Sequence, residues 1–313
     1  MELIAFGTVF LEVVFGDVPA LPGPGEEIFT DQFAFSCGGA AVTAATAAAR
    51  LGAHAGMAAV LGDDLGSRVA EQHCRRAGVD LSPSRYISGP ATGVSVAVNF
   101  DGDRAFISHV PSPPGGGRGF TGHWLEALRT HRPRWCCLHA RPGAVPFLRE
   151  ARSLGVQVAV DVALSDITAH GAAALIDCAR LADVFLPNEA ELLRLTGAGS
   201  LAAALEAALT WCPCVVVTRG ADGAVVAQRD STTYVREGIQ PVLARDRTGA
   251  GDAFAGALIG VVCQGASITE AAVAGNAAGS QTVRVLGAVG EVPMDGLWAQ
   301  PSLADALSAR RHA

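Results

Sequence analysis

The residues from 246 to 252, Asp-Arg-Thr-Gly-Ala-Gly-Asp, place carboxylates beside a turn of small residues. This run follows a strand-like stretch, Ile239–Ala244, and precedes an uncharged apolar run, 253–269, that predicts a helix. The small residues at 249–251 permit a sharp turn, and the free N–H groups and dipole of a helix start favour a phosphate group. An acid in that first turn, Asp252, is better explained as a base that takes a proton from a nucleophile than as a helix cap.

The composition indicates a globular α/β protein and excludes several chemistries. The chain has 313 residues, of which 50% are hydrophobic, enough for one large core with a small appendage. The formal net charge of −7 argues against non-specific binding to nucleic acid. All 23 basic residues are arginine. The absence of lysine excludes a P-loop Gly-Lys-Ser/Thr, the strand lysine of protein kinases and Schiff-base chemistry.

Several features predict a cytoplasmic protein that binds no membrane. The eight cysteines lie mostly in apolar runs, as expected of buried free thiols in a reducing compartment. The N-terminus lacks the basic region of a signal peptide. The apolar run 253–269 is too short, and too rich in Gly and Ala, for a membrane span.

Strand-like and helix-like segments alternate along most of the chain. The predicted strands are Leu3–Phe6, Ala55–Leu61, Trp135–His139, Val156–Val160, Val184–Leu186, Val215–Thr218 and Ala224–Ala227. The predicted helices are Ala40–Leu51, Ser67–Ala77, Val145–Leu154, Ile167–Leu181, Ala190–Thr196, Leu201–Trp211 and Glu270–Thr282. This alternation predicts a parallel sheet covered by helices on both faces, with ligands bound at the carboxyl ends of the strands.

Two stretches interrupt the alternation. Residues 9–35 contain short apolar runs between Pro- and Gly-rich turns, which exclude a helix. Residues 88–110 contain two strand-like runs joined by Asp101-Gly102-Asp103, a strong hairpin signal. We expect these two stretches to meet in space as a flap over the site.

Five motifs, in this order, resemble the ribokinase-like sugar kinases, the PfkB family. They are Gly38-Gly39-Ala40-Ala41, Gly62-Asp63-Asp64-Leu65-Gly66, Asn188-Glu189-Ala190-Glu191, Thr218-Arg219-Gly220 with Gly223, and the run from Asp246 to Asp252. The resemblance covers nearly the whole chain and implies a three-layer αβα sandwich with a mostly parallel central sheet and a small β-sheet lid. It implies a core of residues 1–8, 36–87 and 111–313 with the ATP and catalytic site, and a lid of residues 9–35 and 88–110 over the substrate.

The resemblance implies transfer of a phosphoryl group from ATP to a hydroxymethyl group of a sugar or sugar derivative. Asp252 would be the general base, and the N–H groups of Gly249, Ala250 and Gly251 would form the anion hole. This reaction needs charge stabilisation and positioning more than covalent help. The residues that the resemblance assigns to ATP are Asn188, Thr218, Gly220, Gly223, Gly249, Gly251 and Asn276.

Cations are also implied by the resemblance. Glu191 and Asn188 would support Mg²⁺, mainly through water, because Mg²⁺ usually keeps several waters. The alternative is structural, with Asn188 as a helix cap and Glu191 as a solvated helix residue. Some family members also bind a monovalent cation such as K⁺ beside the glycine turn, which here places Asp246 and Thr248 near such an ion.

The substrate side departs from the family pattern. It would comprise Glu12, Gly38, Gly39, Thr43 and Asp252. The family's first strand runs into Gly-x-x-x-x-Asp, whereas this chain has Glu12 at the aspartate position, and Thr43 stands where an asparagine is common. These changes put ribose specificity in doubt and leave the catalytic half intact.

Other interpretations stay open at this stage. A nucleoside kinase of the same fold could use Phe10, Phe33 and Phe35 as an aromatic shelf for a base. A catalytically lapsed binding protein and a dinucleotide-binding dehydrogenase are further alternatives, the latter lacking the third glycine and the following acid of its fingerprint. His109 and His139 end predicted strands, but without metal-ligand spacing each is better explained as an edge or satisfied polar residue. Exposed strand edges in the lid, together with the resemblance, predict a homodimer through it.

Overall fold

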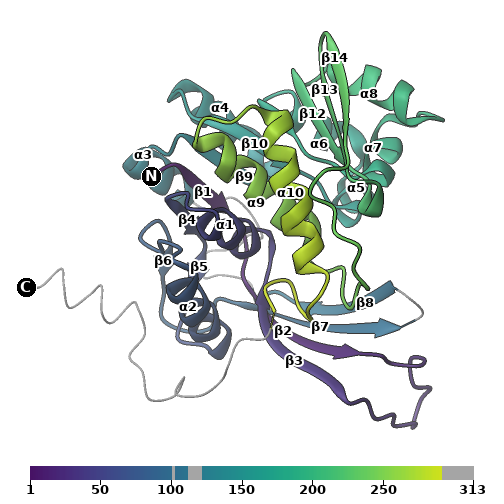
Figure 1. The fold of residues 1–313 in the computed structure, drawn as a ribbon. Coiled ribbons are helices and arrows are strands. Elements are labelled where there is room, and N and C mark those ends of the chain that lie inside the picture. Colours follow the sequence, from purple (N-terminus) through teal and green to yellow (C-terminus); the bar gives the residue numbers. More distant parts are fainter. Residues whose placement is uncertain (101–102, 112–121, 291–313) are drawn as a thin grey trace, which may run out of the picture.

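A mostly parallel sheet forms the centre of the molecule (Figure 1). The structure is a computed structural model that describes residues 1–100, 103–111 and 122–290. The strands of the central sheet are β1 (Leu3–Phe6), β4 (Ala55–Ala58), β9 (Trp135–His139), β10 (Gln157–Asp161), β11 (Val184–Phe185), β12 (Cys214–Thr218), β13 (Ala224–Gln228) and β14 (Ser231–Val235). Their order is β14-β13-β12-β11-β10-β9-β1-β4, in which β13 pairs antiparallel with both β12 and β14 and all other pairs are parallel.

Helices cover both faces of this sheet, as predicted. They are α1 (Ala40–Arg50), α2 (Leu65–Ala77), α3 (Gly122–His131), α4 (Val145–Ser153), α5 (Leu164–His170), α6 (Ala172–Ala179), α7 (Glu189–Thr196), α8 (Leu201–Leu209), α9 (Ala250–Cys263) and α10 (Ile268–Thr282). Successive strand residues point to opposite faces. In β9, Cys136 and Leu138 pack in the core with α3, α4 and α6 to α8, whereas Trp135 and Cys137 pack with α1, α9 and α10.

A separate four-stranded sheet extends from one end of the core (Figure 1). Its strands are β2 (Phe10–Gly16), β3 (Gln32–Gly38), β7 (Gly93–Phe100) and β8 (Asp103–His109), in the order β3-β2-β7-β8. Two short strands, β5 (Val60–Leu61) and β6 (Arg85–Tyr86), pair elsewhere. The predicted turn at Asp101-Gly102 lies outside the described residues, but the strands that it joins pair antiparallel.

The two faces of the small sheet have different environments. On one face, Val14, Ala34 and Ala97 form a buried cluster with Leu286, so this face is covered by the chain that follows α10. Glu12 belongs to the same face, because it lies two residues from Val14 on β2. The opposite face is only partly covered. It carries an apolar row across all four strands, in which the paired residues are Phe35, Val13, Val96 and Ile107.

The predicted strand at Ile239–Ala244 is wrong. The segment is irregular, and it contains Pro241, which has no N–H to give to a sheet. It runs along α10 instead, since the Gln240 N–H donates to Ser280 Oγ and the Arg245 N–H to the Val283 carbonyl. The segment therefore bonds to α10 through its backbone and pairs with none of the described strands, while Pro241, Leu243 and Ala244 are exposed.

No single helix among the described residues is both long and apolar enough to cross a membrane. Only α7 and α8 reach that length and composition together, and they are bent by 67° relative to each other. Both helices also place buried leucines and alanines in the core.

Candidate active site

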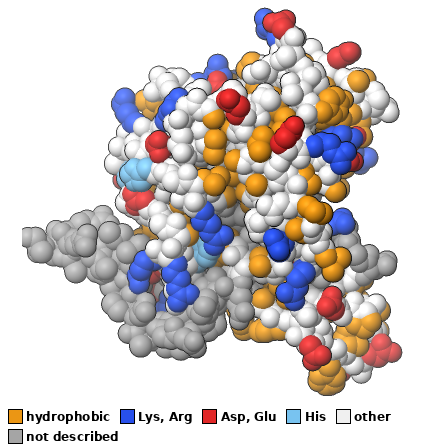
Figure 2. All heavy atoms as spheres, in the orientation of Figure 1, with side chains coloured by type: hydrophobic (Ala, Val, Ile, Leu, Met, Phe, Trp, Pro, Cys, Tyr) orange, Lys and Arg blue, Asp and Glu red, His pale blue; other side chains and the backbone are white. Residues whose placement is uncertain are grey.

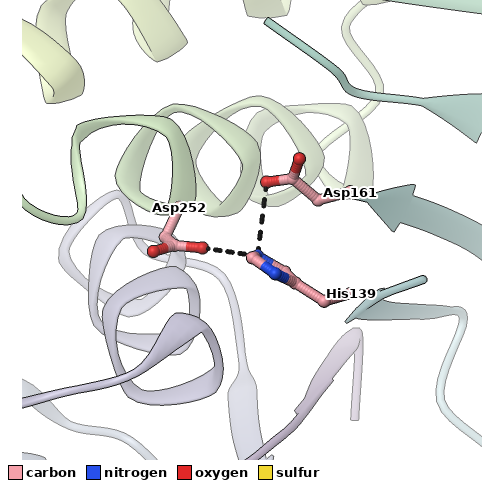
Figure 3. Close-up of side chains that lie close together, drawn as sticks. All are labelled: His139, Asp161 and Asp252. Carbon is pink, nitrogen blue, oxygen red and sulfur yellow. Dashed lines mark hydrogen bonds and ion pairs between the residues drawn. The ribbon is translucent and has the colours of Figure 1, made fainter. Parts of the chain in front are cut away.

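The carboxyl ends of two adjacent strands meet the start of α9 (Figure 3). His139 ends β9 and Asp161 ends β10, and the two are register partners, so their side chains lie on the same side of the sheet. Asp252 lies in the first turn of α9 and points toward both. A small pocket between α1 and these strand ends includes all three side chains in its wall, beside apolar groups such as Phe6.

The three side chains form a close polar cluster. Nε2 of His139 lies 2.9 Å from Oδ1 of Asp252 and 3.6 Å from Oδ2 of Asp161. Their ligand atoms all lie within 4.8 Å of one another, a span that a metal ion could bridge. The direct contact between imidazole and carboxylate pairs the two groups without an ion.

The electrostatics of the cluster follow from its burial. Burial alone would lower the pKa of His139, but the charge of Asp161 and the hydrogen bond and charge of Asp252 raise it to about 9. Burial raises the pKa of Asp161, and the charge of His139 opposes that rise. The acids around His139 thus keep a proton on its ring that an exposed imidazole would release at neutral pH.

The glycine turn before Asp252 has the geometry expected of an anion site. Gly249 is the N-cap residue of α9, with φ of 74°, and no side chain caps the helix. The first helical hydrogen bond runs from the Ala253 N–H to the Gly249 carbonyl, so the N–H groups of Gly251 and Asp252 precede it. A Cβ added at Gly251 would meet open space. Asp252 therefore occupies the first turn without serving as its cap.

Gly249 is required at its position for two reasons. Its positive φ lies in the left-handed region that favours glycine. In addition, a Cβ at this position would lie 2.7 Å from the Cβ of Ala288. The turn is thus packed tightly against the loop that follows α10.

Asp246 fixes this same loop. The side chain is buried, its Oδ1 accepts bonds from the Thr248 N–H and Oγ1, and its Oδ2 accepts a bond from the Gly287 N–H. Asp246 and Thr248 thus bind each other and the backbone. Their role beside a monovalent cation stays a prediction.

Glu12 lies on the other side of the loop. Only 5% of the residue is exposed, and its Oε2 accepts a bond from the Ala288 N–H at 3.2 Å. Burial raises the pKa of Glu12 to about 7, and the charges of Asp246 and Asp252 act in the same direction against the Ala288 bond. The sole acid in this apolar stretch is therefore a buried group beside the site rather than a solvated one.

The glycine pair before α1 makes room for Glu12. A Cβ at Gly38 would lie 1.8 Å from Oε1 of Glu12, and one at Gly39 would lie 2.2 Å from the Thr8 carbonyl oxygen. Thr43 is buried on α1, and its Oγ1 donates to the Gly39 carbonyl. The predicted substrate-side residues are thus close neighbours at the junction of β2, β3 and α1.

On the side away from α1, Asn188 and Glu191 form a capping box at the start of α7. Oδ1 of Asn188 accepts from the Glu191 N–H, and Oε2 of Glu191 accepts from the Asn188 N–H. Burial raises the pKa of Glu191, an effect that the Asn188 bond and the charge of His139 oppose. The structural alternative for Asn188 is therefore present in the fold, while Glu191 is buried near the cluster and not a solvated helix residue.

The remaining residues assigned to ATP line the neighbouring loops. Thr218 ends β12 and forms an isolated parallel β-bridge with Asn188. Gly220 begins the 3-10 turn η2 (Gly220–Asp222), Gly223 follows it, and both glycines have positive φ. A Cβ at Gly223 would lie 2.2 Å from the Val235 carbonyl oxygen. Asn276 is buried on α10, and its Nδ2 donates to the carbonyls of Val235 and Glu237. In this structure Asn276 holds that loop, and its contact with ATP stays a prediction.

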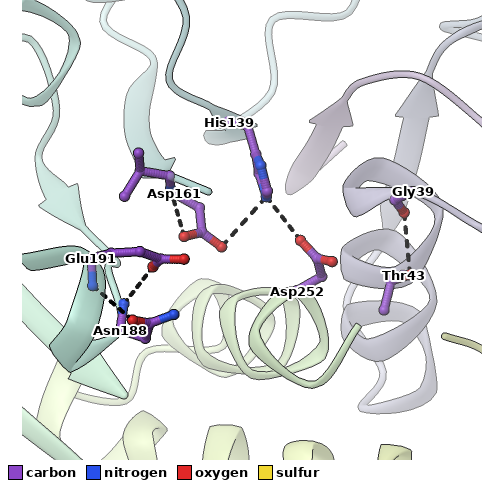
Figure 4. A network of polar contacts seen from close by, with 8 residues as sticks. Gly39, Thr43, His139, Asp161, Asn188, Glu191 and Asp252 are labelled. Carbon is purple, nitrogen blue, oxygen red and sulfur yellow. Dashed lines mark hydrogen bonds and ion pairs between the residues drawn. The ribbon is translucent and has the colours of Figure 1, made fainter. Parts of the chain in front are cut away.

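Asp252 lies between these two groups of residues (Figure 4). Asp161, Asn188 and Glu191 lie on one side of it, and Gly39 and Thr43 on the other. Sequence analysis missed Asp161 and interpreted His139 as a satisfied polar residue, whereas both belong to the cluster around Asp252. The available signal was their position, because each directly ends a buried strand.

Comparison with known proteins agrees with this architecture. A sequence model of the pfkB family of carbohydrate kinases matches residues 7–112 and 146–294. The chain is 26% identical to a ribokinase of Haemophilus influenzae over 291 residues, which cover 88% of this chain and 90% of the relative. It is 27% identical to an aminoimidazole riboside kinase of Salmonella typhimurium over 301 residues, which cover 87% and 91%.

Solved structures share the fold. An Escherichia coli protein described as a ribokinase II, in complex with ATP and Mg²⁺, superposes with a TM-score of 0.78 at 22% identity, covering 93% of this chain and 96% of that one. The chain belongs to the pfkB family of carbohydrate kinases. It is an enzyme of the ribokinase-like fold, with a mostly parallel central sheet and a small separate sheet.

Proposed function

We propose that this enzyme transfers the γ-phosphoryl group of ATP to a hydroxymethyl group of a sugar or sugar derivative. The position of Asp252 carries the proposal. Its carboxylate lies directly after a glycine turn in which the N–H groups of Gly251 and Asp252 precede the first helical hydrogen bond, and between two sets of polar residues (Figure 4). A phosphoryl donor on one side and a hydroxyl on the other would meet at this carboxylate.

Two roles in the reaction are assigned to the chain: acceptance of a proton and stabilisation of charge. The acceptor hydroxyl would give its proton to Asp252 as its oxygen bonds to the γ-phosphorus and the bond to ADP breaks. The N–H groups of Gly249, Ala250 and Gly251 would stabilise the charge of the transferred group. The chain contains no lysine, so backbone amides take the role that a P-loop shares with lysine.

The nucleotide side fits ATP with Mg²⁺, which are present in the Escherichia coli structure with this fold. Glu191 is buried, and its pKa is raised by burial, so a nearby cation would be favourable for its charged form. Glu191 and Asn188 would hold Mg²⁺ mainly through water, since both already bond to backbone. Bound there, Mg²⁺ would offset phosphate charge. A monovalent cation beside Asp246 and Thr248 is part of the same proposal.

On the acceptor side we assign Glu12, Gly38, Gly39 and Thr43 to the substrate, under a lid formed by residues 9–35 and 88–110. The supporting observation is that Glu12, Gly38 and Thr43 meet beside the loop that packs on the glycine turn. Glu12 and Thr43 replace the aspartate and asparagine that the family pattern has at these positions, so we do not assign ribose as the acceptor.

A nucleoside is the second candidate acceptor, since one relative is an aminoimidazole riboside kinase. The expected aromatic shelf is only partly present. Phe33 and Phe35 pair with Phe15 and Val13, and therefore lie on the face of the small sheet opposite Glu12. Phe10 alone shares the face of Glu12 and could contact a base.

The uncovered face of the small sheet supports a homodimer. Ile107 is 78% exposed and Phe33 48% exposed on this face, beside the apolar row described above. Figure 2 shows further apolar side chains at the far end of the sheet, where β2 and β3 are joined. A second copy would bury this exposed apolar surface. We place the enzyme in the cytoplasm, because all eight cysteines are buried free thiols.

Measurement of ATP consumption over a panel of sugars, sugar derivatives and nucleosides tests the proposal. We expect ADP formation that depends on one class of acceptor and a product phosphorylated at a hydroxymethyl group. Absence of turnover over the whole panel together with absence of ATP binding would refute the kinase assignment of this site.

A further inference from the structure

Two side chains, Asp161 and His139, connect the backbone of β10 to the proposed base, Asp252 (Figure 3). The Val162 N–H donates to Oδ1 of Asp161 at 2.6 Å, which fixes that carboxylate at the end of β10. Oδ2 of Asp161 faces Nε2 of His139 at 3.6 Å, and the same nitrogen lies 2.9 Å from Oδ1 of Asp252. The side chains are only 11% to 20% exposed, so the arrangement is screened little by water.

We propose that His139 is a positioning residue for Asp252, and that Asp161 orients His139 for this role. The imidazole engages Oδ1 of Asp252 and leaves Oδ2 for the acceptor hydroxyl. The inference rests on the proposed role of Asp252 as the base, and it adds two residues that support this role.

The charges around His139 also support this role. Four acids act on His139, namely Asp161 on β10, Asp252 on α9, Asp166 on α5 and Glu191 on α7. With ATP bound, the phosphates would add more negative charge, and no lysine is present to offset it. A protonated imidazole gives the carboxylate of Asp252 a positive partner among these acids.

The proton balance is simple. The acceptor hydroxyl gives its proton to Asp252 when its oxygen bonds to phosphorus and ADP leaves, while His139 keeps its own proton throughout. His139 therefore acts on the base and not on the transferred group.

The pairing can be tested without any substrate. In protein labelled with ¹⁵N-histidine, the imidazole signal lost in His139→Gln identifies His139. We expect it to be protonated at about pH 7.5 in the otherwise unaltered chain, and its titration midpoint to fall by about one pH unit or more in Asp252→Asn. A neutral His139 at that pH, or a midpoint unchanged by Asp252→Asn, would overturn the proposal. The titration itself is followed in the unaltered chain and in Asp252→Asn, both of which keep His139.

Turnover with the acceptor found in the panel gives the second test. His139→Gln keeps a hydrogen-bond donor but not the charge, and His139→Ala removes both. We expect kcat to fall about 10-fold and about 100-fold, respectively, with the Kd for ATP within about 2-fold and a changed pH profile, because the charge of His139 is lost in both variants. The control His54→Ala changes an exposed histidine and should leave all three unchanged.

Asp161 should act only through His139. Asp161→Ala combined with His139→Ala should therefore lose little more kcat than His139→Ala alone. If the fold-loss of kcat in the double variant equalled the product of the two single fold-losses, the inference would be overturned. A kcat and pH profile unaffected by His139→Ala would overturn it as well. If no acceptor in the panel turns over, the proposed function fails, whereas the histidine titration still decides whether His139 pairs with Asp252.

Discussion

The carboxylate of Glu12 accepts a hydrogen bond from the Ala288 N–H at 3.2 Å. Ala288 in turn is packed against Gly249: a Cβ added at Gly249 would lie 2.7 Å from the Cβ of Ala288. The small sheet is thus connected, through one loop, to the glycine turn that precedes the proposed base. We expect changes on the substrate side to affect the phosphate turn through this contact.

The burial of Glu12 predicts a pH-dependent effect on stability. The folded-state pKa of Glu12, about 7, exceeds the ordinary 4.5. Between these two pH values the folded protein therefore binds a proton at Glu12 that the unfolded chain has lost. The resulting stabilisation is complete below the ordinary pKa and is lost as the pH rises through about 7. Relative to Glu12→Gln, the free energy of unfolding of the unaltered chain should therefore fall by about 3 kcal/mol across that window. Urea unfolding at several pH values checks this, and a pH-independent difference would contradict it.

Substitution of Gly38 should displace Glu12. In Gly38→Ala the new methyl group would lie 1.8 Å from Oε1 of Glu12, so the carboxylate must leave its place beside Ala288. We expect a stability loss of about 1–3 kcal/mol and an increase in the acceptor KM with ATP affinity unchanged. Gly199→Ala is the matched control, because its Cβ would meet open space. Equal behaviour of the two variants in unfolding and acceptor kinetics would argue against this role of Gly38.

Substitution of the two glycines of the phosphate turn by alanine should change the stability of the protein in opposite directions. Gly249→Ala forces a left-handed φ and a clash with Ala288, so we expect a loss of about 2–4 kcal/mol in unfolding free energy. Gly251→Ala has open space and should stabilise the helix by about 0.5–1 kcal/mol. Turnover should nevertheless fall in Gly251→Ala, because the methyl group would enter the space assigned to the phosphoryl group. Unchanged turnover in the stabilised variant would count against the anion hole.

The proposed dimer makes a separate prediction about the small sheet. Ile107→Glu places a charge in the apolar row across the exposed face, and we expect it to convert the dimer to a monomer in light scattering after gel filtration. Leu243→Glu, at a residue that is 89% exposed outside that face, is the control and should leave the dimer intact. A monomeric unaltered chain, or a dimer that survives Ile107→Glu, would exclude this interface.

Much of the fold follows from local sequence patterns. Short apolar segments alternating with helices predicted the covered parallel sheet, and the interruptions of that pattern predicted the small sheet. The wrong strand at Ile239–Ala244 shows the limit of this approach. This apolar run resembles a strand in composition, but its backbone N–H groups at Gln240 and Arg245 bond to α10 and the following residue Val283 rather than to a strand.

The candidate site also contains a part that local sequence predicts and a part that depends on strand pairing. Asp252 and the glycine turn are contiguous in the sequence, so their shared geometry could be predicted. The contact between His139 and Asp161 depends on the register of β9 against β10, which the sequence does not encode locally. The faces of the small sheet likewise depend on pairing, which is why Phe33 and Phe35 could not be separated from Glu12 before the structure.

The central claim is that Asp252 is the base of a phosphoryl transfer. The most direct measurement compares Asp252→Asn with the unaltered chain, following turnover of the acceptor found in the panel and ATP binding by calorimetry. We predict a loss of kcat of about 10²–10⁴-fold with the Kd for ATP within about 2-fold, because the amide keeps the shape of the side chain but cannot accept the proton. Turnover retained in Asp252→Asn would contradict the account.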